Sequence, residues 1–210
     1  MTVYLLRHTT PLVPAGLCYG QTDLALKETF GTEAAAVRWL LDEDRGAPAG
    51  GNVPGDAHGG TLRVFSSPLT RCLRLARHLW PDAPVRTEDA LKELDFGAWE
   101  NQRWADLEGP GLERWMEDFV NVAVPGGESY RMLYERASRW WEEAIEGRAD
   151  TAIVTHAGVI RSLLCHCSGT DLGLSFQAYD VPYGSVYRLD KENGPWTIRL
   201  LYIHGNRPRR

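Results

Sequence analysis

The chain of 210 residues has only four cysteines and no excess of positive charge. The cysteines show no framework spacing, which argues against a disulfide-stabilised scaffold and favours a reducing, cytoplasmic setting. The formal net charge of −5 excludes a general basic surface for nucleic acid or anionic membranes. No stretch approaches the ~20 apolar residues that cross a bilayer, and the amino terminus lacks the charged region of a signal peptide. We therefore expect a cytoplasmic protein that binds neither nucleic acid nor membrane.

The chain does contain an alternation of short apolar runs and helical patterns, within a length that suits one sizeable core. The predicted strands are residues 3–6, 63–65, 85–87, 152–155, 185–189 and 197–201. The predicted helices are residues 27–42, 67–79, 104–120 with an interruption at 109–111, 129–146 and 158–167. Ser67 is expected to cap the second helix and Pro68 to occupy its first position. This order predicts one domain over residues 1–210, a three-layer α/β/α sandwich with a mostly parallel central sheet.

Two segments depart from the alternation. Residues 43–60 are rich in glycine and proline, which predicts a long, flexible surface loop. Residues 91–127 have helical but no strand pattern, and we expect them to form a helical cap over a ligand site. The sequence gives no indication of the oligomeric state.

Polar residues follow two of the predicted strands directly. Arg7 and His8 come after the first strand, and His156 comes after the strand at 152–155. The carboxyl ends of parallel strands meet at one edge of a sheet, where ligands bind. Two histidines and an arginine at that edge indicate a site for a phosphate anion.

Two further residues complete a set suited to phosphoryl transfer. Arg71 lies at the start of the second helix, and Glu93 lies in the segment that follows the third strand. Arginine matches phosphate geometry with two hydrogen bonds, and a neutral imidazole can take a phosphoryl group covalently. A protonated carboxylic acid can supply the proton that the leaving alkoxide needs.

These residues stand in motifs that together resemble the histidine phosphatase superfamily, also called phosphoglycerate mutase-like. The motifs are Leu6-Arg7-His8-Thr9, Ser66-Ser67-Pro68-Leu69-Thr70-Arg71, Leu91-Lys92-Glu93-Leu94-Asp95-Phe96-Gly97-Ala98-Trp99-Glu100, Pro125-Gly126-Gly127-Glu128-Ser129 and Val154-Thr155-His156-Ala157-Gly158. The resemblance implies a phosphoric monoester hydrolase in which His8 becomes phosphorylated and Glu93 is the proton donor. It implies that Arg7, Arg71 and His156 bind the phosphate of a small-molecule substrate, without a metal or other cofactor.

The motif around His8 departs from the family pattern Arg-His-Gly-Glu-Thr, which an asparagine follows. Here Thr9-Thr10-Pro11 follow His8 and no asparagine is near. Gln21 is the candidate replacement, because its amide donates two hydrogen bonds. Residues 18–24 and 93–100 resemble the α-ribazole phosphatase group within the superfamily. That resemblance implies α-ribazole 5′-phosphate or cobalamin 5′-phosphate as the substrate, and a role in cobalamin biosynthesis.

Several alternatives stay open at this point. Another small-molecule phosphatase, a phosphoglycerate mutase and a non-catalytic protein that binds a phosphorylated ligand would each use such a site. Trp99 and Trp104 either pack in the core or offer faces on which a planar substrate stacks. Glu128 is either a first-turn acid favoured by the helix dipole or a residue that orients an arginine or His156.

Overall fold

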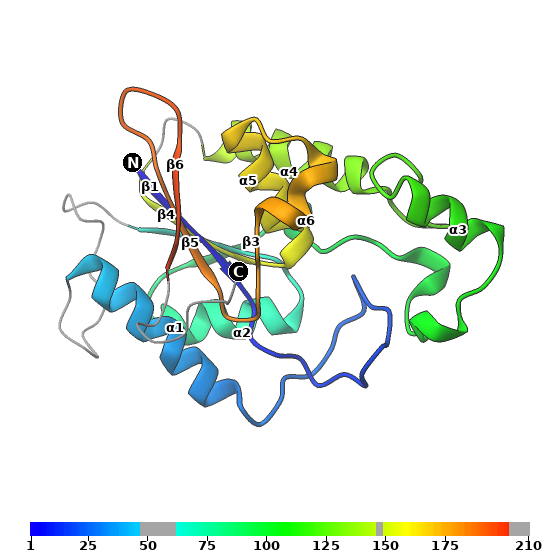
Figure 1. Ribbon diagram of the computed structural model, residues 1–210. Helices are drawn as coiled ribbons and strands as arrows, with labels where there is room; N and C mark the ends of the chain where they lie inside the picture. Colours follow the sequence, from blue (N-terminus) through cyan, green and yellow to red (C-terminus); the bar gives the residue numbers. More distant parts are fainter. Residues whose placement is uncertain (47–61, 146–148, 202–210) are drawn as a thin grey trace.

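The computed structural model describes residues 1–46, 62–145 and 149–201. Within those residues, six strands form one sheet in the order β3-β2-β4-β1-β5-β6 (Figure 1). The strands are β1 Thr2–Arg7, β2 Arg63–Ser66, β3 Val85–Thr87, β4 Thr151–Thr155, β5 Val186–Asp190 and β6 Thr197–Leu201. Strands β3, β2, β4 and β1 are parallel, whereas β5 and β6 are antiparallel to their neighbours. The mostly parallel sheet predicted from the sequence is confirmed.

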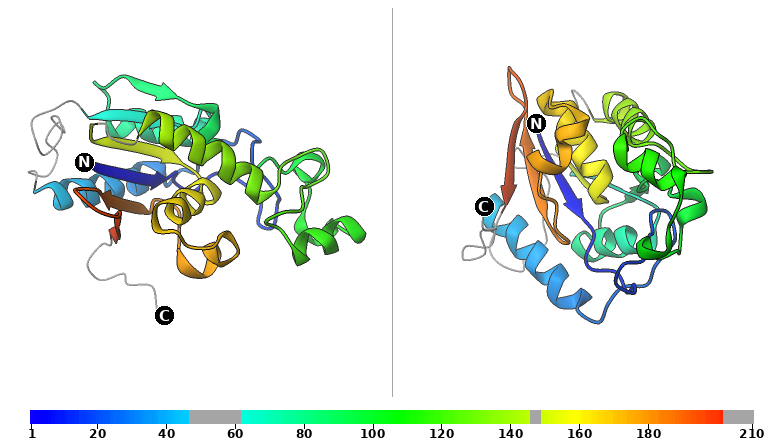
Figure 2. Two further views of the ribbon diagram at one scale, coloured as in Figure 1. Left: turned by 90° about the horizontal axis from the view of Figure 1, so that it is seen from above. Right: turned by 45° about the vertical axis from the view of Figure 1, so that its right-hand side comes forward.

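The helices cover both faces of this sheet. They are α1 Phe30–Arg45, α2 Thr70–Leu79, α3 Pro110–Glu117, α4 Tyr130–Ala144, α5 Ala157–Ser168 and α6 Ser175–Ala178, with 3₁₀ turns η1 Asp89–Leu91, η2 Gly97–Trp99, η3 Trp104–Asp106 and η4 Leu172–Leu174. Helices α1 and α2 lie on one face, and α4 and α5 on the other (Figure 2). The three-layer α/β/α sandwich is therefore also confirmed.

The alternation of side chains along β1 explains how one strand supports two cores. Val3 and Leu5 join the apolar cluster under α4 and α5, while Tyr4 and Leu6 join the cluster under α1 and α2. All four are buried, as expected for a central strand covered on both faces. This packing fixes the carboxyl end of β1, from which the next residues enter the site.

The predicted loop at 43–60 is wrong for its first residues. Helix α1 continues to Arg45 and ends at Gly46, whose φ of 64° is left-handed and suits glycine. Asp44 holds the last turn in place, because its carboxylate accepts hydrogen bonds from the Tyr4 hydroxyl and from Arg188. Residues 47–60 of the predicted loop lie outside the described residues.

The predicted start of the second helix is also wrong. Helix α2 begins at Thr70, and Pro68 precedes it. The cap comes from a distant segment: Asp23 accepts hydrogen bonds from the Thr70 backbone amide at 2.8 Å and from its hydroxyl at 2.6 Å. Ser67 is thereby available for a different contact, described below.

The segment from residue 91 to residue 127 consists of loops, 3₁₀ turns and helix α3, and it projects beyond the carboxyl end of β1 (Figure 2). Helix α3 begins with Pro110 at its first position, where proline needs no amide hydrogen. Helix α4 then starts at a Ser129 cap, which accepts from the Met132 amide. Among the described residues, no helix has the length and apolar character needed to span a membrane.

Candidate active site

The parallel neighbours β1 and β4 place both histidines at one sheet edge. Arg7 is in register with Thr155, so the residues that follow them, His8 and His156, emerge side by side. Their ring centroids are 5.1 Å apart. The His8 amide donates to the Thr155 carbonyl at 3.1 Å, which fixes the backbone at this point. Both side chains are buried, with 2% and 0% exposure respectively.

The hydrogen bonding of His8 defines which ring nitrogen can react. Its Nδ1 lies 2.7 Å from the Thr9 carbonyl oxygen, and a carbonyl can only accept, so we assign the ring proton to Nδ1. Burial, followed by the positive charges of Arg71 and Arg7, holds the pKa of His8 well below its usual value. The neutral ring therefore keeps an unprotonated Nε2, which is a nucleophile.

Two arginines flank this nucleophile with their side chains fixed by backbone carbonyls. Arg7 donates from Nη1 to the Val181 carbonyl at 2.6 Å. Arg71 is fully buried and donates to the carbonyls of Thr22 and Gly20. The Nε of each arginine is buried and has no hydrogen-bond partner within the described part of the chain. Buried N–H donors without a partner are costly, so these guanidinium groups are suited to an anion that accepts from them.

His156 is held by residues at the start of α2. Its Nε2 is 2.8 Å from the Ser67 hydroxyl and 3.4 Å from the Cys72 sulfur. Ser67 thus positions a site histidine, a contact that explains why it does not cap the helix. Burial is the main reason that the pKa of His156 is well below its usual value, and the charge on Arg71 adds to it.

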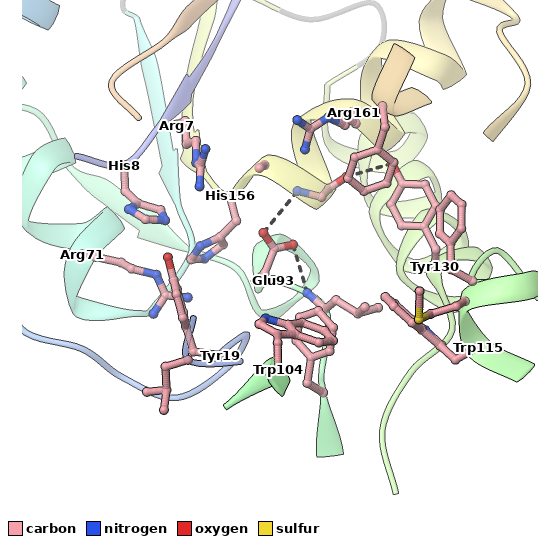
Figure 3. Close-up of a pocket in the computed structure, with 18 residues that line it drawn as sticks. Arg7, His8, Tyr19, Arg71, Glu93, Trp104, Trp115, Tyr130, His156 and Arg161 are labelled. Carbon is pink, nitrogen blue, oxygen red and sulfur yellow. Dashed lines mark hydrogen bonds between the residues drawn. The ribbon is translucent and has the colours of Figure 1, made fainter. Parts of the chain in front are cut away.

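Glu93 lies next to His156 in the cavity, as Figure 3 shows. Its carboxylate accepts from the backbone amides of Leu94 at 3.0 Å and Gly158 at 3.2 Å. A Cβ at position 158 would lie 2.3 Å from Glu93 Oε1, so only glycine allows this approach. The amino end of α5 therefore carries both His156 and the amide that positions Glu93.

Glu128 takes one of the two roles left open by the sequence, since it orients an arginine. Both of its carboxylate oxygens accept from Arg136, at 2.8 and 2.9 Å. Arg136 also donates to the Glu93 carbonyl at 3.0 Å and to the Ala90 carbonyl at 2.7 Å. The pair therefore supports the backbone on which Glu93 is mounted.

The site residues share one cavity of about 510 Å³. The polar end is formed by Arg7, His8, Arg71, Glu93 and His156. The rest of the lining is mostly aromatic, and Trp104, Trp115 and Tyr130 lie on the side away from His8 in Figure 3. The other aromatic lining residues of this wall are Phe96, Phe119 and Phe176. A phosphate ester could place its anion at the first end and a flat apolar group against the second.

The two tryptophans left open by the sequence have different locations. Trp104 lines the cavity. Trp99 is buried, 7% exposed, in a small cluster with Cys18, Leu107 and Val124, so its role is packing. Sequence reasoning missed Trp115 and Phe119, although their spacing of four residues would place them on one face of a helical segment.

The structure does not bring Gln21 to the phosphate end. Its side-chain amide donates to the Glu93 carbonyl at 3.2 Å, and Gln21 is not among the cavity residues. A pair of tyrosines lies there instead, with the hydroxyls of Tyr19 and Tyr183 2.5 Å apart. The Tyr183 ring is stacked on the Arg7 guanidinium, 3.8 Å from its Cζ. A phosphate contact by Gln21 therefore stays a prediction from the sequence alone.

The lowered pKa values predict that His8 and His156 stay neutral where ordinary histidines titrate. We expect neither ring to gain a proton between pH 7.5 and about 6, whereas histidines in the urea-unfolded chain titrate near 6.5. The unfolded state then binds more protons, so the free energy of unfolding should fall as the pH drops through 6.5. Long-range ¹H–¹⁵N NMR, with assignment by His8→Gln and His156→Gln, measures the protonation. A His8 resonance that titrates at 6.5 or above contradicts this prediction.

Comparison with known families and sequences gives one match over nearly the whole chain. The family model described as "Histidine phosphatase superfamily (branch 1)" matches residues 3–204. A bifunctional protein of Mycobacterium tuberculosis is 33% identical over 156 residues, which cover 70% of this chain and 39% of that protein. Phosphoserine phosphatase 1 of Hydrogenobacter thermophilus is 26% identical over 139 residues, covering 62% of this chain and 66% of that enzyme. The chain thus spans about two fifths of the first relative's length.

Solved structures give a fold match over the full length. The alpha-ribazole phosphatase from Shigella flexneri superposes with a TM-score of 0.81 at 22% identity, covering 100% of both chains. A mycobacterial glucosyl-3-phosphoglycerate phosphatase superposes with a TM-score of 0.75 at 24% identity, covering 95% of this chain and 98% of the other. At these identities the likeness establishes a common fold.

Proposed function

The chain belongs to the histidine phosphatase superfamily, and from this premise we propose that it hydrolyses phosphomonoesters through a phosphohistidine at His8. The family match confirms the superfamily predicted from the motifs, and its phosphatase relatives support a phosphoric monoester hydrolase. The observation that carries the proposal is the His8 ring, whose Nδ1 is committed to the Thr9 carbonyl. That arrangement leaves Nε2 as the nucleophile in a cavity lined by Arg7 and Arg71.

In the first step, His8 Nε2 attacks phosphorus and the bond from phosphorus to the ester oxygen breaks. Protonated Glu93 gives its proton to the leaving alkoxide. Arg7, Arg71 and His156 hold the charge on the three non-bridging oxygens. The proposed step uses no metal, because the two guanidinium groups supply the positive charge.

In the second step, water attacks the phosphohistidine and restores His8. Glu93, now a carboxylate, accepts the proton from that water, and inorganic phosphate leaves. A phosphoglycerate mutase would instead retain the phosphoryl group and return it to the product. Release of phosphate from p-nitrophenyl phosphate would exclude a non-catalytic binding protein, and a lack of bisphosphoglycerate-dependent isomerisation would exclude a mutase.

We further propose α-ribazole 5′-phosphate, or the related cobalamin 5′-phosphate, as the substrate. The support comes from the segments at 18–24 and 93–100 and from the aromatic wall of the cavity. The benzimidazole ring of this substrate is flat and apolar, so Trp104 and Trp115 could stack on it. Structures with the same fold include two that are named for this activity.

This substrate assignment predicts a preference over 3-phosphoglycerate. We expect kcat/KM for α-ribazole phosphate to be at least ~10²-fold higher, equivalent to ~2.7 kcal/mol of differential transition-state binding. The physical reason is that burial of a ring against the aromatic wall contributes ~1.5–3 kcal/mol, which the small phosphoglycerate cannot gain. A panel of phosphomonoesters that includes phosphoserine measures this preference. A ratio near one removes the substrate assignment and leaves the general phosphatase mechanism intact.

A further inference from the structure

One cation in the cavity has no part in the mechanism described above. Arg161 lies on α5, one helical turn after Gly158, and lines the same cavity as His8 and Glu93. In Figure 3 it lies above Glu93, on the side of the cavity away from Arg71. Because Glu93 is the proposed proton donor to the leaving oxygen, a cation beside it is close to the part of a substrate that leaves.

The Arg161 side chain is held in place without using its terminal amino groups. Its Nε donates to the Tyr179 carbonyl at 3.1 Å, and its Cζ lies 4.5 Å from the centre of the Phe176 ring. These contacts fix the plane of the guanidinium. Within residues 1–46, 62–145 and 149–201, Nη1 and Nη2 have no hydrogen-bond partner. Four N–H bonds are thus available at one edge of the cavity.

The charge of Arg161 also has no carboxylate partner in the described chain. The charge of Glu93 acts on Arg161, but the Glu93 carboxylate is hydrogen-bonded to the amides of Leu94 and Gly158. Burial is the main reason that the pKa of Arg161 is lowered, and Arg7 adds to it, while Tyr130 and Glu93 act in the opposite direction. A partly buried cation that forms no ion pair costs free energy, and an acceptor on a ligand would offset that cost.

We propose that Arg161 is a specificity-determining residue that binds a second acceptor, on the alcohol portion of the phosphomonoester substrate. The inference rests on the proposed function, because it assigns the phosphate to the histidine end of the same cavity. A carboxylate would gain most, since its two oxygens match the two terminal amino groups. Ring nitrogens and hydroxyl oxygens would accept more weakly. The substrate class is therefore a phosphomonoester with an apolar body and an acceptor near the scissile ester.

The test compares two aromatic substrates that differ in one group, phenyl phosphate and 3-carboxyphenyl phosphate. The readout is kcat/KM for the carboxylated ester divided by kcat/KM for the plain ester. The intrinsic reactivities of the two esters are the same for every variant, so a change in this ratio between variants reports a change in enzyme contacts. We expect Arg161→Met to lower the ratio of carboxylated to plain substrate by ~10- to 100-fold, the range for a charge-assisted hydrogen bond. Arg161→Lys should recover part of it. Arg139→Met, at an exposed position on α4 outside the cavity, should leave it unchanged.

Two outcomes overturn the proposal. One is a ratio that stays the same in Arg161→Met. The other is an equal loss on both substrates together with a lower melting temperature, which indicates that Arg161 only anchors the Tyr179 carbonyl. Binding provides a readout that does not depend on turnover: titration calorimetry with benzylphosphonate and 3-carboxybenzylphosphonate should give the same dependence on Arg161. If the wild-type chain hydrolyses neither ester, the proposed function fails, and the calorimetric comparison still decides the role of Arg161.

Discussion

His8→Ala is expected to lower kcat/KM for every phosphomonoester substrate by at least ~10³-fold, because it removes the proposed phosphoryl acceptor. His156, the neighbouring ring, has its Nε2 engaged with Ser67 at 2.8 Å. The arginines can still bind phosphate in this variant, so binding of inorganic phosphate should be retained while turnover is lost. Steady-state hydrolysis of p-nitrophenyl phosphate, combined with phosphate titration, separates these two effects.

The same variant identifies the intermediate. Phosphohistidine is a phosphoramidate, which is labile in acid and stable in base. Wild-type enzyme quenched in base during turnover should therefore retain ³²P on one histidine. The phosphate should be absent from His8→Ala and present in His78→Ala, which changes an exposed histidine at the end of α2. Base-stable phosphate on a residue other than His8, or full activity in His8→Ala, contradicts the mechanism.

Local patterns were sufficient to predict the sheet and the positions of its polar ends. The apolar run before His8 and the one before His156 became adjacent parallel strands, β1 and β4. A short apolar run predicts a buried strand, and the carboxyl ends of parallel strands meet at one edge of the sheet. The meeting of the two histidines could therefore be inferred from the sequence. The start of α2 could not be, since its cap is Asp23, which lies 47 residues before Thr70. A cap supplied from such a distance leaves no signal in the sequence around the helix.

The aromatic wall of the cavity could not be predicted from the sequence either. Its aromatic residues come from the segment at 94–119, from α4 and from α6, so only the folded chain brings them together. Arg161 has the sequence surroundings of an ordinary helical arginine, and its lack of a carboxylate partner in the described chain is visible only in three dimensions. The same applies to Trp99 and Trp104: the motif that contains Trp99 does not tell which of the two faces the cavity and which packs beneath it.

Glu93→Gln is expected to slow the phosphorylation step in proportion to the basicity of the leaving group. Glutamine keeps the size of the side chain, and its carbonyl oxygen can still accept from the amide of Gly158, but it has no acidic proton to give. A ribose 5′-alkoxide needs that proton, so we expect a loss of ~10²–10⁴-fold for its phosphate ester. p-Nitrophenolate is a stable anion and barely needs it, so the loss should be much smaller in a single-turnover burst.

The matched control for this variant is Asp95→Asn. The Asp95 carboxylate accepts from the Gly97 amide at 2.8 Å, and Asp95 is not among the cavity residues. The carboxylate of Glu100 is likewise engaged, with the Gln21 and Thr22 amides at 2.9 and 3.1 Å. Neither group should therefore show a dependence on the leaving group. If Glu93→Gln slows both esters equally, and Asp95→Asn slows the alkoxide ester selectively, the proton donor is Asp95 and the assignment of Glu93 is wrong.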